Sequence, residues 1–319
     1  MSHRHAFLFA LLLALAPCAH AQDTIPLPWT QGTKLVYDSM TVDEKMANGV
    51  RRTATTRAVS TIEITEAGPD GFVQVWRDSN GSVRLEGDSP DVAAEQAQMR
   101  ALIARFEGVP IEAQLDARGE FTGVRNWQAV GAVIREALTP AMRAQVRLRA
   151  RSDITDADID ARLQPVLANI TTQAAIDATV GKNPSIYNLF TAPALAPGKP
   201  VRYAAELQSP VSPHRIPAVG QFELVDGEPG SLTVTIRWTQ SIDPRKGAEA
   251  AWAMVAALTG KPLPADRSEL PKQLLLRDEA TMVVHRRTGV PISLRHERRL
   301  ELGGQVKATT WTFKRQAGS

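Results

Sequence analysis

Apolar and polar side chains alternate along two separate regions, one near each end of the chain. In the first region, residues 33–40 alternate, residues 53–65 are rich in Thr, Val and Ile, and residues 72–76 are an apolar run after a Gly-Pro turn. These patterns are typical of half-buried strands. We therefore predict an antiparallel meander, with Asn80-Gly81 supplying the positive φ angles of a tight hairpin turn.

In the middle of the chain the apolar spacing changes to three or four residues, which is typical of amphipathic helices. This spacing occurs in four segments, residues 92–106, 127–138, 141–149 and 155–179. We predict that Pro140 separates the second segment from the third, and that residues 111–124 form a hairpin that returns the chain to the sheet. Four prolines between residues 184 and 200 predict an irregular crossing after the helices.

Strand patterns resume at Val201 and continue to the end of the chain. Leu232, Val234, Ile236 and Trp238 share one face of a strand, which is therefore predicted to be buried while the opposite face is wet. The predicted elements of this region are strands at residues 201–207, 221–225, 232–238, 280–285, 291–299 and 305–314 and a helix at residues 248–258.

Together these elements predict an α+β fold, in which a curved antiparallel sheet or half-barrel is built from two similar meanders and helices cover one face. The predicted division is a signal peptide at 1–21, an N-terminal β half at 22–125, a helical insertion at 126–197 and a C-terminal β half at 198–319. The spacing of Gly32 and Tyr37 recurs in Gly198 and Tyr203. This likeness is open to two interpretations, an internal duplication or the general resemblance of antiparallel meanders.

The first residues have the three parts of a secretory signal peptide. A charged head at residues 3–5 precedes an apolar stretch at 6–16 and small residues that end at Ala21. The stretch is shorter than the roughly 20 residues that span a bilayer. We therefore expect cleavage after Ala21, a periplasmic or secreted mature chain and no transmembrane anchor. Cys18 gives an alternative, a bacterial lipoprotein box with a lipidated cysteine, although Pro17 departs from that pattern.

Charge and cysteine content limit the classes of partner. The formal net charge is only +3, and the basic clusters are local, so nucleic acid is not an expected partner. Cys18 is the only cysteine, which excludes intrachain disulfides. The mature fold is therefore expected to depend on burial alone, which is feasible for a chain of this length.

The chain contains no local motif of nucleophilic catalysis, phosphate binding or dinucleotide binding. Outside the leader the histidines are His214, His285 and His296, and their spacing indicates neither a metal site nor a catalytic site. Asp156 and its acidic neighbours lack the glycine and glutamate of a calcium loop, so we interpret Thr155 as the N-cap of a helix. No cofactor, metal or catalytic residue is predicted, and the ligand-binding residues are unknown.

Two features of the sequence resemble known groups of proteins. The Gly-x-x-x-x-Tyr opening at residues 32–37 and the Arg-x-Thr-Gly-x-Pro pattern at residues 286–291 resemble uncharacterised exported bacterial β-rich proteins described as domains of unknown function. The architecture resembles periplasmic half-barrel lipoprotein carriers, except in residues 126–197. This resemblance implies a curved sheet suited to an apolar ligand, and it assigns a role to no residue.

Two functional hypotheses follow from the sequence. The first is an envelope protein without enzymatic activity that binds an apolar small molecule or a protein partner. The alternative is a hydrolase whose site is assembled from distant residues, for instance around His285, His296 and Glu297. The tryptophans fit either a packed core or the lining of a cavity; those outside the leader are Trp29, Trp76, Trp127, Trp238, Trp252 and Trp311.

Overall fold

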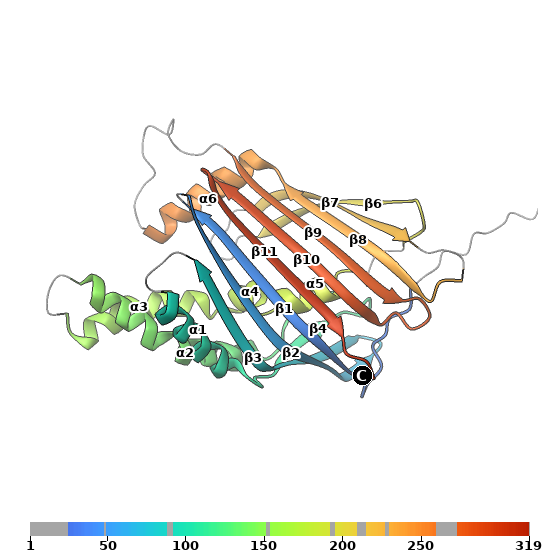
Figure 1. The fold of residues 1–319 in the computed structure, drawn as a ribbon, viewed down its shortest axis with the longest axis horizontal. Coiled ribbons are helices and arrows are strands. Elements are labelled where there is room, and N and C mark those ends of the chain that lie inside the picture. The colour runs from blue at the N-terminus through green and yellow to red at the C-terminus, as the bar shows by residue number, and fades with distance from the viewer. Residues whose placement is uncertain are drawn as a thin grey trace, which may run out of the picture.

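The computed structural model contains one 11-stranded antiparallel sheet, with helices against one of its faces (Figure 1). The predicted α+β fold is thereby confirmed. The described residues are 25–47, 49–87, 92–150, 154–191, 195–208, 215–226, 230–259 and 273–318. The expected leader, with Cys18 and Ala21, and His214 lie outside them.

The sheet joins two meanders in the order β5-β4-β3-β2-β1-β11-β10-β9-β8-β7-β6. The first meander consists of β1 (Lys34–Ala47), β2 (Val50–Gly68), β3 (Gly71–Gly87), β4 (Ile111–Leu115) and β5 (Phe121–Val124). The second consists of β6 (Val201–Gln208), β7 (Arg215–Asp226), β8 (Thr233–Ile242), β9 (Leu274–His285), β10 (Pro291–Leu302) and β11 (Gln305–Arg315). Because β1 pairs with β11, the first and last strands lie in the centre, and β5 and β6 are the two edges.

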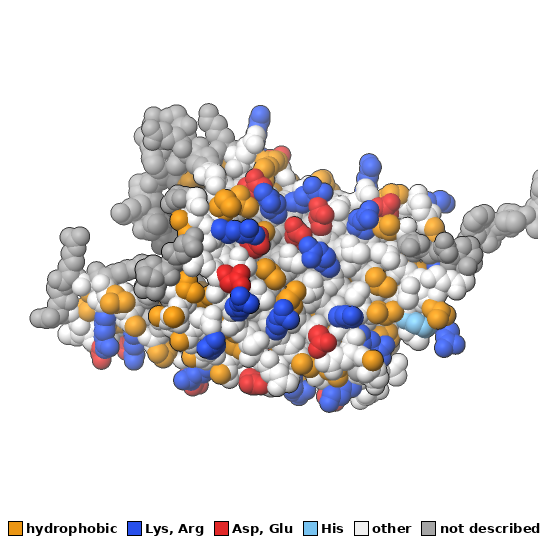
Figure 2. Space-filling model, in the orientation of Figure 1, with side chains coloured by type: hydrophobic (Ala, Val, Ile, Leu, Met, Phe, Trp, Pro, Cys, Tyr) orange, Lys and Arg blue, Asp and Glu red, His pale blue; other side chains and the backbone are white. Residues whose placement is uncertain are grey.

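Six helices are found in the described part of the chain: α1 (Val92–Phe106), α2 (Trp127–Arg149), α3 (Asp156–Ile170), α4 (Gln173–Thr179), α5 (Lys182–Asn188) and α6 (Pro244–Thr259). Figure 1 shows α4 and α5 behind the sheet. We call the sheet face that packs against α5 the inner face and the opposite one the outer face. Figure 2 shows the outer face, over which Lys, Arg, Asp and Glu side chains are spread. Ion pairs such as Arg295–Glu297 and Arg277–Glu279 lie there.

The predicted hairpin turn at Asn80-Gly81 is wrong, because β3 continues through these residues. Asn80 has the expected positive φ of 55°. However, a β-bulge accommodates this backbone conformation within the strand. The register with β2 shifts between the Arg57↔Ser82 and Val59↔Ser79 pairs. The carboxylate of Glu107, which follows α1, accepts a hydrogen bond from the Asn80 N–H at 2.9 Å. The end of α1 therefore lies beside this part of β3, where the partner strand of a hairpin would otherwise lie.

The predicted effects of two prolines are also wrong. Pro140 lies inside the continuous helix α2, where contacts with the neighbouring helices α1, α3 and α4 outweigh one lost backbone hydrogen bond. Pro184 is the third residue of α5, a helix that the sequence did not predict. Proline is tolerated there because N–H groups of the first turn have no partner within the helix.

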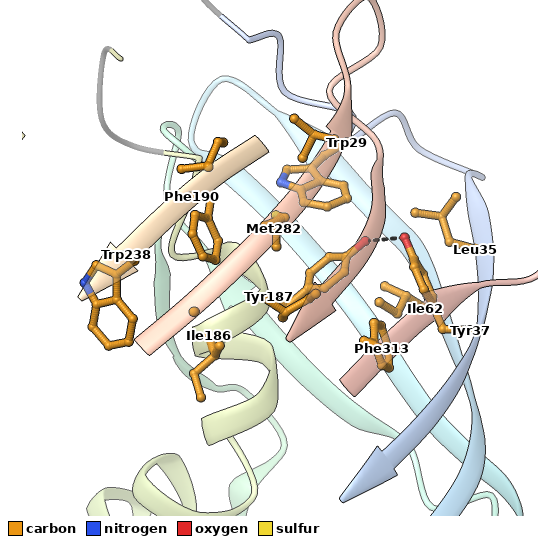
Figure 3. Close-up of a cluster of buried hydrophobic side chains, with 14 of the residues drawn as sticks. Trp29, Leu35, Tyr37, Ile62, Ile186, Tyr187, Phe190, Trp238, Met282 and Phe313 are labelled. Carbon is orange, nitrogen blue, oxygen red and sulfur yellow. Dashed lines mark hydrogen bonds between the residues drawn. The ribbon is translucent and has the colours of Figure 1, made fainter. Parts of the chain in front are cut away.

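Aromatic rings fill the space between α5 and the inner face. Tyr187 of α5 reaches into the sheet towards Tyr37 of β1, with Trp29 and Phe313 beside them (Figure 3). Tyr37 and Phe313 stack with their ring centroids 4.3 Å apart. The Tyr37 hydroxyl donates to the carbonyl of Pro291 at 2.9 Å, so its 2.7 Å contact with Tyr187 requires the Tyr187 hydroxyl to be the donor. This pair connects α5 to β1 and β10.

The two tyrosine hydroxyls should contribute unequally to stability. Tyr187→Phe removes one donor and leaves the Tyr37–Pro291 bond, so we expect the free energy of unfolding to fall by about 1 kcal/mol. Tyr37→Phe leaves both the Tyr187 hydroxyl and the Pro291 carbonyl buried without a partner, which costs about 1–3 kcal/mol. Urea denaturation of both variants measures the difference, and a larger loss for Tyr187→Phe would contradict this assignment of donors.

Candidate functional site

The buried amide of Asn188 fixes α5 to the first meander. Asn188 and Gln74 exchange two hydrogen bonds, at 2.9 and 3.0 Å, and both residues are completely inaccessible to solvent. The Trp76 indole also donates to the Gln74 carbonyl oxygen at 3.0 Å. Since unpaired amides would be costly at this depth, the helix has one favourable position on β3.

An open cleft of about 480 Å³ lies beside α5, between the two edges of the sheet. Its apolar lining consists of Phe121, Leu189, Val201 and Phe222, which come from β5, the end of α5, β6 and β7. Its polar lining includes Ser185, Tyr203 and Gln240. The cleft is therefore amphipathic, and α5 forms one wall.

Gly220 allows Tyr203 to form the polar end of the cleft. A Cβ atom on Gly220 would lie only 2.3 Å from the Tyr203 ring, so a larger residue would displace that ring. In its observed position the Tyr203 hydroxyl donates to Gln240 at 2.9 Å and accepts from the Trp238 indole at 2.6 Å. Burial and the charge of Asp278 raise the pKa of Tyr203 and outweigh the Trp238 hydrogen bond, so the hydroxyl remains protonated.

A row of polar residues crosses the inner face from this end of the cleft. The strand register places Gln240 opposite Asp278, Asp278 opposite Arg298, Arg298 opposite Thr309, and Thr309 opposite Asp43. The neighbouring row is more apolar and includes Trp238, Ala280 and Trp311. A polar band therefore runs along the margin of the hydrophobic core.

Asp278 is the centre of this polar row. Its carboxylate is 1% exposed and accepts two bonds from Arg298, at 2.7 and 2.9 Å, and one from His296 Nε2 at 2.9 Å. Burial alone would raise the pKa of Asp278, but these hydrogen bonds and charges hold it below its ordinary value. Because the carboxylate only accepts, Nε2 of His296 carries a proton.

His296 has the structure of a core residue rather than of a catalytic base. Its side chain is 1% exposed and its ring is stacked near Trp238. The second ring nitrogen, Nδ1, is buried without a hydrogen-bond partner. Among the described residues, no serine or other nucleophile is therefore in position to transfer a proton to this imidazole.

Lys182, the first residue of α5, lies near the same polar row. Burial lowers the pKa of its ammonium to about 8, with a further lowering by the charge of Arg298, while Asp278 and Asp43 act in the opposite direction. Lys307 contributes a smaller lowering. The lysine is thus held where its charged form is disfavoured.

The three residues suggested for a hydrolase do not meet. His285 lies at the end of β9 with its Nδ1 3.1 Å from the Thr288 hydroxyl, whereas His296 lies in the middle of β10. Glu297 follows His296 in the strand and therefore faces the opposite side of the sheet, where it pairs with Arg295. That assembly of a hydrolase site has no support in the geometry.

The sequence did not indicate Asp278 or Lys182 as site residues. The strand containing Asp278 was predicted to begin at residue 280, but β9 begins at Leu274, so its pairing with His296 could not be anticipated. Lys182 fell in a segment predicted to be irregular. The interpretation of Thr155 was correct, because this residue forms a capping box with Asp158. Within the described ranges, no group of three or more His, Cys, Asp or Glu side chains is arranged to hold a metal ion.

Comparisons with known proteins give only distant structural similarities. No protein-family model matches the chain, and no curated protein matches it significantly. The chain is similar to lipovitellin, from a structure describing its lipid–protein interactions, with a TM-score of 0.47 and 9% identity. That alignment covers 91% of this chain and 25% of the lipovitellin chain, so this chain spans about a quarter of that protein's length.

Two bacterial proteins align with most of the chain at still lower TM-scores. An outer membrane channel from Pseudomonas putida F1 gives a TM-score of 0.24 at 8% identity, over 92% of this chain and 98% of the channel. The translocator domain of the autotransporter NalP from Neisseria meningitidis gives 0.19 at 8% identity, over 90% and 89%. All three proteins are too distant to assign a function to this chain. A search of the described helices finds none with the length and hydropathy of a membrane span.

Replacement of Lys182 should change how stability depends on pH. The pKa of Lys182 is about 8 in the folded state and 10.5 ordinarily. Between these pH values the unfolded chain binds more protons than the folded chain, so the free energy of unfolding rises with pH. We expect Lys182→Met to be more stable than the wild type at neutral pH, by about 1–2 kcal/mol after allowance for partial exposure. This advantage should disappear as the pH rises from about 8 to 10.5.

Urea denaturation at a series of pH values measures this difference, and the exposed Lys199→Met provides the control. The control should change the free energy of unfolding little at any pH. An advantage of Lys182→Met that persists unchanged at high pH would show that desolvation of the ammonium is not its cause.

Proposed function

We propose that this protein is an exported envelope protein that binds an apolar ligand in the cleft beside α5 and catalyses no reaction. The observation that carries the proposal is the composition of this cleft. Its apolar walls, including Leu189 and Phe222, lead to hydrogen-bonding groups of Tyr203 and Gln240. Ligand sites are typically concave, mainly apolar and supplied with a few oriented polar groups.

The volumes of the available spaces favour the cleft over the core. The space among the core residues near Trp29 and Tyr187 is only about 20 Å³, enough for about one water molecule. The cleft, at about 480 Å³, lies within the range of roughly 300–1,000 Å³ for ligand sites. A ligand would therefore bind between the sheet edges, with the aromatic core remaining packed.

A groove of about 540 Å³ between α1 and α2 is one competitor for an apolar ligand. It is lined by Met99, Leu102 and Leu138, but its charged residues Glu95 and Arg105 are engaged in exposed ion pairs. The cleft beside α5 instead has polar groups that partly buried hydrogen bonds hold in place. Fixed groups lose less conformational entropy on binding, which favours the cleft.

We also propose that the leader is cleaved after Ala21 and that the mature chain is periplasmic or secreted. In this proposal, segments 22–125 and 198–319 are the two β halves, and segment 126–197 is an insertion that supplies the cleft with α5. Mass spectrometry of the mature protein distinguishes cleavage after Ala21 from lipidation of Cys18, because the two products differ in their first residue and in attached lipid.

Filling the cleft should weaken ligand binding without changing the fold. Val201 lines the cleft and is 36% exposed, so Val201→Trp places an indole in the space that the ligand would occupy. We expect its affinity for an alkyl ligand such as dodecanol to fall by roughly tenfold or more, a loss of at least about 1.4 kcal/mol. Isothermal titration calorimetry with the mature protein measures this affinity.

Val225→Trp is a matched control. Val225 lies on the adjacent strand β7, is 40% exposed and does not line the cleft. This variant should bind the ligand as the wild type does. Equal binding by both tryptophan variants would place the ligand elsewhere, and failure of the wild type to bind alkyl ligands would reject the proposed function.

A further inference from the structure

The two edges of the sheet end differently. The short edge strand β5 is covered by a helix, because the Val124 N–H donates to the Asp177 carboxylate of α4 at 2.7 Å. The other edge strand, β6, is longer, and β7 is the only described element that pairs with it. An uncovered edge presents backbone N–H and C=O groups to which another strand can bind.

β6 lacks the features that commonly protect an edge strand from pairing, which are proline, lysine, a β-bulge or a charge directed towards the core. Residues 201–208 include neither proline nor lysine. All of them pair with β7 without a shift of register, so no bulge bends the strand. The inner-face side chains that follow Val201 by alternation are Tyr203, Ala205 and Leu207, which carry no charge. β6 is therefore a regular edge that is open to a partner.

The outer face of β6 carries one charge of each sign. Arg202 and Glu206 are exposed, and their even spacing places them on the same face. The Arg202 guanidinium donates to Gln221 on β7 at 3.2 Å, and no carboxylate among the described residues forms an ion pair with it. A strand with this order of charges is complementary to an antiparallel copy of itself, because reversal brings Arg202 opposite Glu206 at both ends.

The alternation of the backbone limits the possible registers of such a pair. Every second residue of a strand directs its N–H and C=O towards the same neighbour, so residues that face each other across a self-pair are an even number of positions apart. Facing Arg202 with Glu206 meets this condition and places Ala204 opposite its own copy. A shift by two residues leaves both charges opposite uncharged residues, and a shift by four places like charges opposite each other.

The other facing residues in this register also fit. At the centre the exposed Ala204 faces a second Ala204, which allows close approach. On the inner face Tyr203 lies opposite Ala205, so a large side chain meets a small one. Val201, which is 36% exposed, lies opposite Leu207 and gains an apolar neighbour. Such cross-strand pairs are the contacts that stabilise antiparallel sheets.

We infer that two copies of this chain pair antiparallel along β6, with the two-fold axis at Ala204 and an Arg202–Glu206 ion pair on each side of it. One continuous sheet then runs through both copies. Because the same surface of each copy is used, the assembly closes at two. Backbone hydrogen bonds hold the strands together, while the two ion pairs select the register. The inference does not require a ligand in the cleft.

Sedimentation velocity of the mature protein at low salt, over a series of concentrations, tests the inference. The wild type should show a reversible equilibrium of monomer and dimer. Arg202→Glu and Glu206→Arg each place like charges opposite each other twice in the dimer. We expect either substitution to raise the dissociation constant of the dimer by roughly tenfold or more.

Charge exchange tests the register itself. The double variant Arg202→Glu/Glu206→Arg restores opposite charges at both positions and should dimerise as the wild type does. An equimolar mixture of the two single variants should form dimers that contain one copy of each. Arg237→Glu is the matched control, since it makes the same change of charge on the outer face of the interior strand β8 and should leave dimerisation unchanged. Circular dichroism confirms that each variant is folded.

The outcomes decide the inference in either direction. A wild type that remains monomeric at every concentration overturns it, and so does a dimer that neither single variant weakens. If both single variants weaken the dimer but the double variant does not restore it, Arg202 and Glu206 do not face each other and the inference is wrong. Loss in the single variants with recovery in the double variant and in the mixture supports it.

Discussion

The position of α5 against the inner face depends on the buried hydrogen bonds of two consecutive residues, Tyr187 and Asn188. The Tyr187 hydroxyl bonds to Tyr37 on β1, and the Asn188 amide bonds twice to Gln74 on β3. Apolar packing alone would allow a short helix to slide or rotate, because hydrophobic contacts are not directional. Buried amides and hydroxyls permit one register, since any other leaves them without partners.

This anchoring explains the layout of the inner face. Tyr187 and Asn188 fix the helix, and Ser185 and Leu189, beside them in the sequence, form a wall of the cleft. The first residue, Lys182, is brought near the charged row around Asp278. The docking of α5 therefore determines the packed core and the cleft together, whereas the charged row is set by the strand register of the sheet.

The sheet could be predicted from the sequence because its signal is repeated along the chain. The alternation at Val234, Ile236 and Trp238 gave the correct buried face of β8, since each of these side chains is at most 5% exposed. Leu232, predicted to share that face, instead precedes the strand and is 73% exposed. Local turn chemistry was less reliable. Asn80 has the backbone conformation of a hairpin turn, but the long partner strand β2 and the covering helix α1 convert it into a bulge.

The candidate site could not be predicted because it depends on contacts between distant residues. Asn188 and Gln74 are 114 positions apart, and nothing near either residue indicates the pairing. Pro184 suggested an irregular segment, although a proline in the first turn is compatible with the helix that carries the site. His296 was noted without Asp278, because a carboxylate that binds across two strands leaves no local motif.

Nuclear magnetic resonance of the mature protein, with labelled methyl groups and increasing dodecanol, tests the central claim most directly. Binding against the anchored helix predicts chemical-shift changes concentrated on Leu189 of the cleft wall and Val201 of β6, with little change at Leu102 and Leu138 in the groove between α1 and α2. Changes concentrated at Leu102 and Leu138, with Leu189 and Val201 unaffected, would contradict the account.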